Sequence, residues 1–272
     1  DLHSFPTRRS SDLVLRFYII MFIFGTAMGS FLMCQAWRLK YRTHCQSLGQ
    51  RSICLACRYQ LQWFDNLPLI SWLCLKGKCR KCGAKIGIAE ILTEILLGLI
   101  FLGLSTTIDI NTATPLTWVL FGLEIIFTLL ISFLAIYDGK WGELPETILT
   151  FSIICAIILS ILKQWSLFSN FSFLGLINII GSVLILGGTY WLLYVFSKGK
   201  WVGNGDFILG ISLGLAIGDT WLALIVLFIA NLLGFIIMAP TKQHKVHLGP
   251  FLVIAFFIVS FFPDFFRGLI GF

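Results

Sequence analysis

The chain has 272 residues, of which 58% are hydrophobic and only 12% are charged, and it includes 26 Phe and 9 Trp. This composition excludes an ordinary soluble domain and indicates a polytopic protein whose main partner is the lipid bilayer. The formal net charge of +7 does not predict a nucleic-acid partner, because 10 of the 20 Lys and Arg fall between Arg38 and Lys85. Such a basic cluster is typical of a cytoplasmic loop.

The first thirteen residues, DLHSFPTRRSSDL, look like one reading frame of a sequencing-adapter oligonucleotide. We therefore interpret 1–13 as an artefact and exclude it from the fold. The apolar runs that follow predict about eight transmembrane helices, since a bilayer core needs about 20 apolar residues per helix. The expected helices are 14–37, 88–106, 116–137, 147–162, 173–196, 207–217, 221–238 and 249–266.

The predicted fold class is therefore an all-α polytopic membrane protein with three parts. A first transmembrane helix covers 14–37, a small polar loop domain covers 38–87, and a seven-helix membrane domain covers 88–272. Gly25 and Gly29 in the first helix are small residues that let helices approach closely.

Two glutamates, Glu90 and Glu94, lie four residues apart at the start of the second helix and so share one helical face. We interpret both as ordinary interfacial charges. The alternative is that they line a polar cavity facing the loop.

Two Cys-x-x-Cys pairs lie in the polar loop, Cys54 with Cys57 and, 21 residues later, Cys79 with Cys82. Four thiolates in two such knuckles match a tetrahedral structural zinc site, and in a cytoplasmic loop metal binding is favoured over disulfides. The metal would stabilise a loop too small to build its own core. A redox dithiol and a nucleic-acid-binding ribbon are the competing interpretations.

The distribution of Lys and Arg among the loops predicts the orientation of the helices. Loops 38–87, 138–146, 197–206 and 239–248 hold 10, 1, 2 and 2 basic residues, and the alternate loops hold only Lys163. The positive-inside rule places the first set in the cytoplasm. Asp138 at the end of the third helix and Asp206 at the start of the sixth are then expected on the same cytoplasmic face.

Carboxylates at a membrane-helix boundary are candidates for function, because burying their charge is costly. Two that sit close together share a proton, so that one can activate water while the other stays protonated, which suits peptide hydrolysis. Gly203 and Gly205 precede Asp206 and would let backbone approach an extended substrate. The alternative for Asp206 is a plain helix cap. His244 and His247 are interpreted as solvated loop residues.

These motifs together resemble the bacterial type IV prepilin peptidases, aspartic proteases of the Gly-x-Gly-Asp type. The resemblance rests on Asp138 with Leu144-Pro145, on the cysteine knuckles, and on further blocks in the first helix, the loop and the last helix. Those further blocks are Gly29-Ser30-Phe31-Leu32, Trp63-Phe64-Asp65-Asn66-Leu67-Pro68-Leu69-Ile70-Ser71-Trp72, Gly203-Asn204-Gly205-Asp206 and Gly249-Pro250-Phe251. Met33 and Ile208 depart from the residues usual in the family.

The resemblance implies an inner-membrane enzyme whose active site faces the cytoplasm. It would remove the basic leader of prepilins or pseudopilins with Asp138 and Asp206, and then methylate the new amino terminus with S-adenosylmethionine. It also implies that Cys54, Cys57, Cys79 and Cys82 bind zinc. A presenilin-like protease and a non-catalytic zinc-bearing assembly factor are the alternatives.

Overall fold

The computed structural model describes residues 8–41, 53–54, 56–110, 112–168, 173–238 and 247–270. The chain divides into two compact units, Asp1–Thr112 and Ala113–Phe272. The helices of unit 1 are α1 (Arg8–Lys40), η1 (Trp63–Asn66), α3 (Ile70–Cys74) and α4 (Ile88–Ser105). Those of unit 2 are α5 (Pro115–Trp141), α6 (Glu146–Phe168), α7 (Phe173–Val183), η2 (Leu184–Gly188), α8 (Thr189–Ser197), α9 (Asn204–Ile217), α10 (Thr220–Met238), α11 (Gly249–Phe261) and α12 (Pro263–Ile270).

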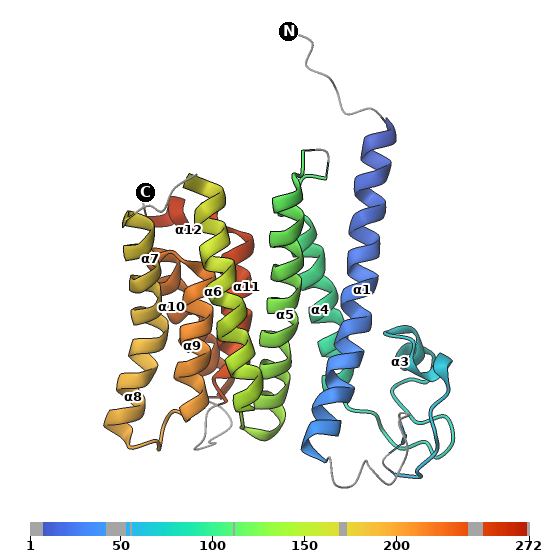
Figure 1. The fold of residues 1–272 in the computed structure, drawn as a ribbon. Coiled ribbons are helices and arrows are strands. Elements are labelled where there is room, and N and C mark those ends of the chain that lie inside the picture. Colours follow the sequence, from blue (N-terminus) through green and yellow to red (C-terminus); the bar gives the residue numbers. More distant parts are fainter. Residues whose placement is uncertain are drawn as a thin grey trace. The chain divides into compact units, whose positions relative to one another are not determined.

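The expected all-helical membrane architecture is confirmed (Figure 1). Six of the described helices are long and apolar enough to cross a membrane, or seven if the bent pair α11 and α12 forms one span. The exception among the expected spans is α9, whose 14 residues measure about 21 Å, less than a bilayer core of about 30 Å. It can be short because α6, α7, η2, α8, α10 and α11 all pack around it.

Unit 1 is built on the pairing of α1 with α4, and small residues set their distance. A Cβ added at Gly25 would lie 2.6 Å from the Leu97 carbonyl oxygen, and one at Gly29 would lie 2.8 Å from Cα of Glu94. Only glycine permits backbones to approach this closely. The predicted role of Gly25 and Gly29 is therefore confirmed. By these contacts α4 groups with α1, while the predicted domain boundary at residue 87 stays a prediction.

Glu94 corrects one interpretation, because its side chain is buried and not an interfacial charge. Its Oε2 accepts a hydrogen bond of 2.8 Å from the backbone N–H of Leu69. Leu69 has φ +59°, a conformation that is strained for a β-carbon-bearing residue. The carboxylate of Glu94 thus holds the strained turn at the start of α3 against α4.

The fifth expected helix, 173–196, contains the π-helical turn η2, which packs closely against α9. A Cβ added at Gly210 would lie 2.5 Å from the Leu186 carbonyl oxygen, and one at Gly214 would lie 2.8 Å from that of Ser182. The Ser182 hydroxyl donates hydrogen bonds to the carbonyls of Ile179 and Gly214. The wider π turn therefore faces the glycine side of α9.

Other helix boundaries also differ from the expected ones. The expected loop 163–172 begins too early, because α6 continues to Phe168 and Lys163 pairs with Glu124 of α5 at 2.8 Å. The eighth expected helix, 249–266, is bent by 87° between α11 and α12. Pro263 explains the break, because proline disfavours helical backbone in the residue before it.

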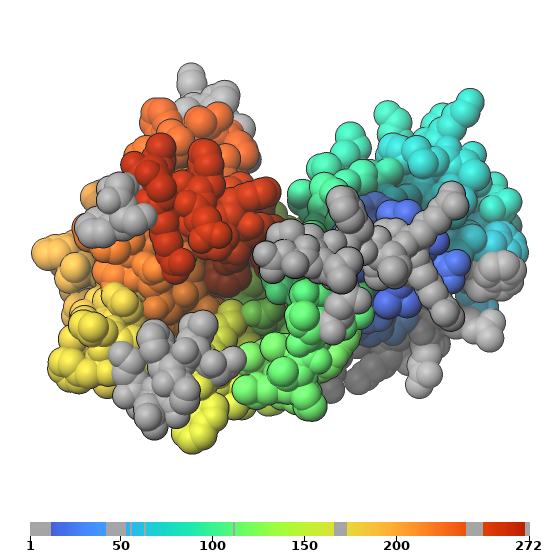
Figure 2. All heavy atoms as spheres, turned by 90° about the horizontal axis from the view of Figure 1, so that it is seen from above, coloured from blue at the N-terminus to red at the C-terminus, as the bar shows by residue number. Residues whose placement is uncertain are grey.

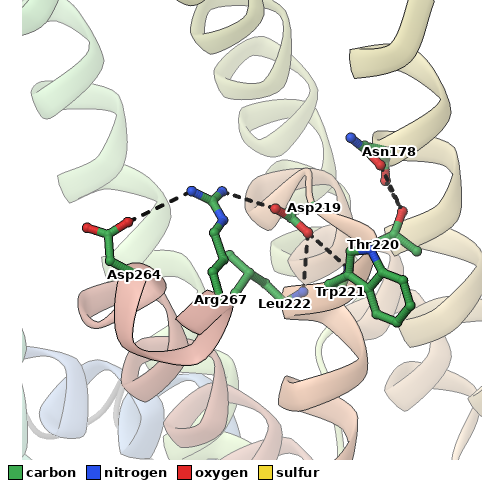
Figure 3. A network of polar contacts seen from close by, with 7 residues as sticks. All are labelled: Asn178, Asp219, Thr220, Trp221, Leu222, Asp264 and Arg267. Atoms are coloured by element: carbon green, nitrogen blue, oxygen red, sulfur yellow. Dashed lines mark hydrogen bonds and ion pairs between the residues drawn. The ribbon is translucent and has the colours of Figure 1, made fainter. Parts of the chain in front are cut away.

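A polar network holds the bend at this end of unit 2 (Figure 3). Asp219 Oδ1 accepts the backbone N–H groups of Trp221 and Leu222 at the start of α10, and its Oδ2 lies 3.0 Å from Arg267 of α12. Seen from above, α12 appears in red at the surface of this end, beside the orange α10 (Figure 2). Asp219 is therefore a structural carboxylate.

Candidate active site and metal centre

Asp138 lies in the last turn of α5, at the end of the third expected helix, as predicted. The helix continues to Trp141 and ends at Gly142, whose φ of +66° suits glycine. Residue 138 is therefore held by regular helical backbone on both sides. Its side chain is buried, with the residue only 5% exposed.

The two carboxylate oxygens of Asp138 face different partners from the start of α11. Oδ2 accepts a hydrogen bond of 2.9 Å from the backbone N–H of Gly249. Oδ1 lies 3.9 Å from Nδ1 of His247. A Cβ at residue 249 would lie 2.7 Å from Oδ2, so this contact requires glycine. His247, interpreted as a solvated loop residue, lies in the loop before α11 with its side chain 37% exposed and in addition contacts Asp138. His244 lies outside the described residues.

Asp206 lies in the first turn of α9, which begins at Asn204 and not after the aspartate. Its Oδ2 accepts a hydrogen bond of 2.8 Å from the backbone N–H of Gly203, the residue that caps the helix. The capping interpretation is thus correct in part, because Asp206 satisfies a free N–H at the helix start. The residue is nevertheless buried, at 6% exposure.

Helix α11 brings the two aspartates into one region, since it packs against both α5 and α9. Asp206 interacts electrostatically with Asp138 and with His247. The end of α5 and the starts of α9 and α11 lie at the same end of unit 2 in Figure 1. Two buried carboxyl groups thus lie within electrostatic reach of each other in unit 2.

The glycines before Asp206 have roles that the sequence analysis did not predict. Neither has a positive φ, so neither is required by a tight turn. A Cβ at Gly205 would lie 2.6 Å from Cβ of Leu144, in the loop between α5 and α6. Gly205 therefore lets the start of α9 pack on that loop, which leads directly to the helix end carrying Asp138.

The four predicted cysteine ligands of unit 1 converge. Their Sγ atoms all lie within 4.8 Å of one another, with Cys54 and Cys82 at 3.8 Å and Cys57 and Cys79 at 4.0 Å. A tetrahedral zinc ion with Zn–S bonds of about 2.3 Å places its sulfur ligands about 3.8 Å apart. The donor set and its spacing therefore fit such an ion, and the cluster could hold a metal.

The two knuckles repeat one backbone pattern. Cys54 N–H donates to the carbonyl of Tyr59 and Cys79 N–H to that of Ala84, each at 2.8 Å. Each knuckle turns through a residue of positive φ, which is Arg58 in the first and Gly83 in the second. Backbone N–H groups of Cys82 and Lys81 lower the pKa of the Cys79 thiol to about 6, which favours the thiolate form that binds metals.

Asp65, from the Asp-Asn-Leu-Pro block of the loop, anchors the second knuckle. Its Oδ1 accepts a 2.8 Å hydrogen bond from Nε of Arg80, which lies between the two ligands of that knuckle. Its Oδ2 accepts the backbone N–H of Gln62, and the side chain is 2% exposed. The guanidinium of Arg80 also lies over the Phe64 ring, 4.9 Å from its centroid. This aspartate has a structural role.

Comparison with known proteins adds independent observations. Residues 23–108, which lie within unit 1, match the model of the Bacterial Peptidase A24 N-terminal domain. The prepilin leader peptidase/N-methyltransferase of Dichelobacter nodosus is 32% identical over 210 residues, which cover 75% of this chain and 68% of the relative. The chain belongs to the prepilin leader peptidase/N-methyltransferase family.

Two further relatives with the same description support this assignment. The Neisseria gonorrhoeae protein is 31% identical over 212 residues, which cover 76% of this chain and 70% of the relative. The protein of Aeromonas salmonicida strain A449 is 28% identical over 285 residues, 91% of each chain. The similarity to these relatives therefore extends over both units, whereas the match to the domain model lies within unit 1. No solved structure matches the chain.

Proposed function

We propose that this chain is an intramembrane aspartic endopeptidase that removes the leader peptide of type IV prepilins or pseudopilins. One observation carries the catalytic assignment: Asp138 and Asp206, 68 positions apart, are both buried and interact at one end of unit 2. In this pair one carboxylate activates water and the other gives a proton to the scissile carbonyl. Gly203 and Gly205 support the geometry of Asp206.

The site faces the cytoplasm in this proposal, at the inner membrane. Its support is the positive-inside rule, because the loops expected on the aspartate side carry the larger number of Lys and Arg. Glu143 and Glu146 are exposed in the segment that follows α5, at the same end as Asp138. Their carboxylates would attract the basic leader of a membrane-inserted precursor.

Zinc is the metal assigned to Cys54, Cys57, Cys79 and Cys82, with a structural role. Four cysteine ligands leave no open coordination position, which distinguishes structural from catalytic zinc sites. N-methylation of the new amino terminus follows cleavage in this proposal, and its support is the printed description of the relatives. S-adenosylmethionine is the methyl donor by family resemblance, and we assign none of the described residues to it.

The test is leader cleavage of a generic prepilin in membranes that contain this protein. We expect Asp138→Asn and Asp206→Asn each to lower the rate by on the order of a thousandfold or more, because an amide cannot exchange the shared proton. Asp219→Asn is the matched control, since that aspartate caps α10 and binds Arg267. It should leave cleavage within about twofold, as expected for a residue remote from the reacting groups.

Mass spectrometry of the product tests the second activity, since a product heavier by one methylene shows methyl transfer. Substantial cleavage by either Asn variant would refute the assignment of that aspartate. Absence of cleavage by the unmutated protein, when it is inserted and holds zinc, would favour the non-catalytic assembly factor.

A further inference from the structure

His247 contributes an ionisable group to the aspartate site that the leader-peptidase mechanism above leaves unused. Its Nδ1 lies 3.9 Å from Oδ1 of Asp138, and its side chain is 37% exposed. The same edge of the ring lies against the glycine that ends α5, because a Cβ at Gly142 would lie 2.5 Å from Cε1 and 2.8 Å from Nδ1 of the imidazole. The imidazole thus packs against the end of α5, next to a candidate catalytic carboxylate.

The contact between His247 and Asp138 is one of charge. A separation of 3.9 Å is too long for a hydrogen bond but close enough for an imidazolium and a carboxylate to attract each other. Among the described residues, Asp138 on α5 lies beside the imidazole, and Asp206 on α9 interacts electrostatically with it. Both of these groups are carboxyl groups.

The two oxygens of Asp138 then have complementary anchors. The Gly249 N–H holds Oδ2 through a 2.9 Å hydrogen bond, while the imidazole attracts Oδ1. With one anchor alone the carboxyl group could rotate about its bond to Cβ. With two, its plane is fixed relative to Asp206, and reacting groups in a fixed geometry react faster.

We propose that His247 is a positioning residue of the aspartate pair, whose imidazolium fixes the Asp138 carboxylate together with the Gly249 N–H. This inference rests on the proposed function. Because His247 acts through Asp138 in this proposal, its loss lowers kcat and leaves KM unchanged. The partial exposure of the imidazole screens the attraction, so the effect is smaller than that of losing an aspartate.

The test compares His247→Gln, which removes the charge, with His247→Lys, which keeps a cation, in the full-length protein cleaving a generic prepilin. We expect His247→Gln to lower kcat about tenfold with KM within about twofold. His247→Lys should retain at least about a third of the kcat, because it preserves the attraction to Asp138.

Lys200→Gln is the matched charge control, because it removes an exposed cation from the loop before α9. It should leave kcat unchanged, and thermal unfolding of each detergent-solubilised variant separates misfolding from lost positioning. A His247→Gln enzyme with normal kcat, a Lys variant as slow as the Gln variant, or a change in KM alone would each overturn the inference. Asp138→Asn distinguishes the two proposals, because its inactivity beside a fully active His247→Gln would refute only the role of His247.

Discussion

The two units hold their polar sites by different means. Among the residues of 53–86 whose burial is described, only Gly77 and Cys79 are buried, so the loop of unit 1 has almost no core of its own. Its order depends on four converging thiols and on Asp65 and Glu94, which accept hydrogen bonds from the loop. In unit 2 the carboxylates lie in the end turns of packed helices. A metal can thus replace a core in a loop, whereas a buried carboxyl pair needs backbone donors at helix ends.

Metal removal should produce the largest effect, confined to unit 1. Chelation, or Cys79→Ser, should release the loop 53–86, because structural zinc contributes on the order of 10 kcal/mol to folding in small metal-binding domains. Metal analysis and limited trypsin digestion measure this, since the loop contains several Lys and Arg.

Cys74→Ser is the matched control for metal removal. Cys74 is exposed at the end of α3 and is not part of the four-thiol cluster. This variant should keep both its metal and its resistance to trypsin. Equal digestion of chelated and metal-loaded protein would contradict the difference between the units.

Gly249→Ala should impair unit 2 through geometry alone. The new Cβ would lie 2.7 Å from Oδ2 and 3.2 Å from Cβ of Asp138, so the carboxylate must move. We expect leader cleavage to fall about a hundredfold, as for other displacements of about 1 Å in active sites. Zinc content should be unchanged.

Gly122→Ala provides the comparison, because a Cβ there meets nothing within 4 Å and alanine favours helix. It should retain full cleavage with equal or greater thermal stability. Normal cleavage by Gly249→Ala would show that the helix end tolerates a side chain at the site.

Arg267→Gln should have the smallest effect. It removes the 3.0 Å pair with Asp219 at the opposite end of unit 2, but Arg267 is 49% exposed and Asp219 would still cap α10. Partly exposed ion pairs contribute about 1 kcal/mol or less. Thermal unfolding should therefore shift slightly, with cleavage unaltered; a large loss of cleavage would link this network to the aspartates.

Local sequence determined the features that depend on residues close together in the chain. Apolar runs predicted the long helices, because a long apolar segment in a bilayer must satisfy its backbone hydrogen bonds internally. The short helices η1 and α3 in the polar loop were not predicted. The cysteine spacing predicted the two knuckles, whose turns involve only neighbouring residues. Asp138 and Asp206 were singled out by the cost of a carboxylate at a membrane boundary.

Tertiary structure alone decided which distant groups meet. No local pattern indicates that His247 and Gly249 contact Asp138, although the nearby Gly-Pro-Phe block was a signal that this segment matters. The burial of Glu94 against Leu69 and the short length of α9 likewise follow from packing between elements. The physical reason is that a long apolar run specifies a membrane helix by itself. The side-chain contacts of that helix depend instead on how closely glycines allow neighbouring helices to approach it.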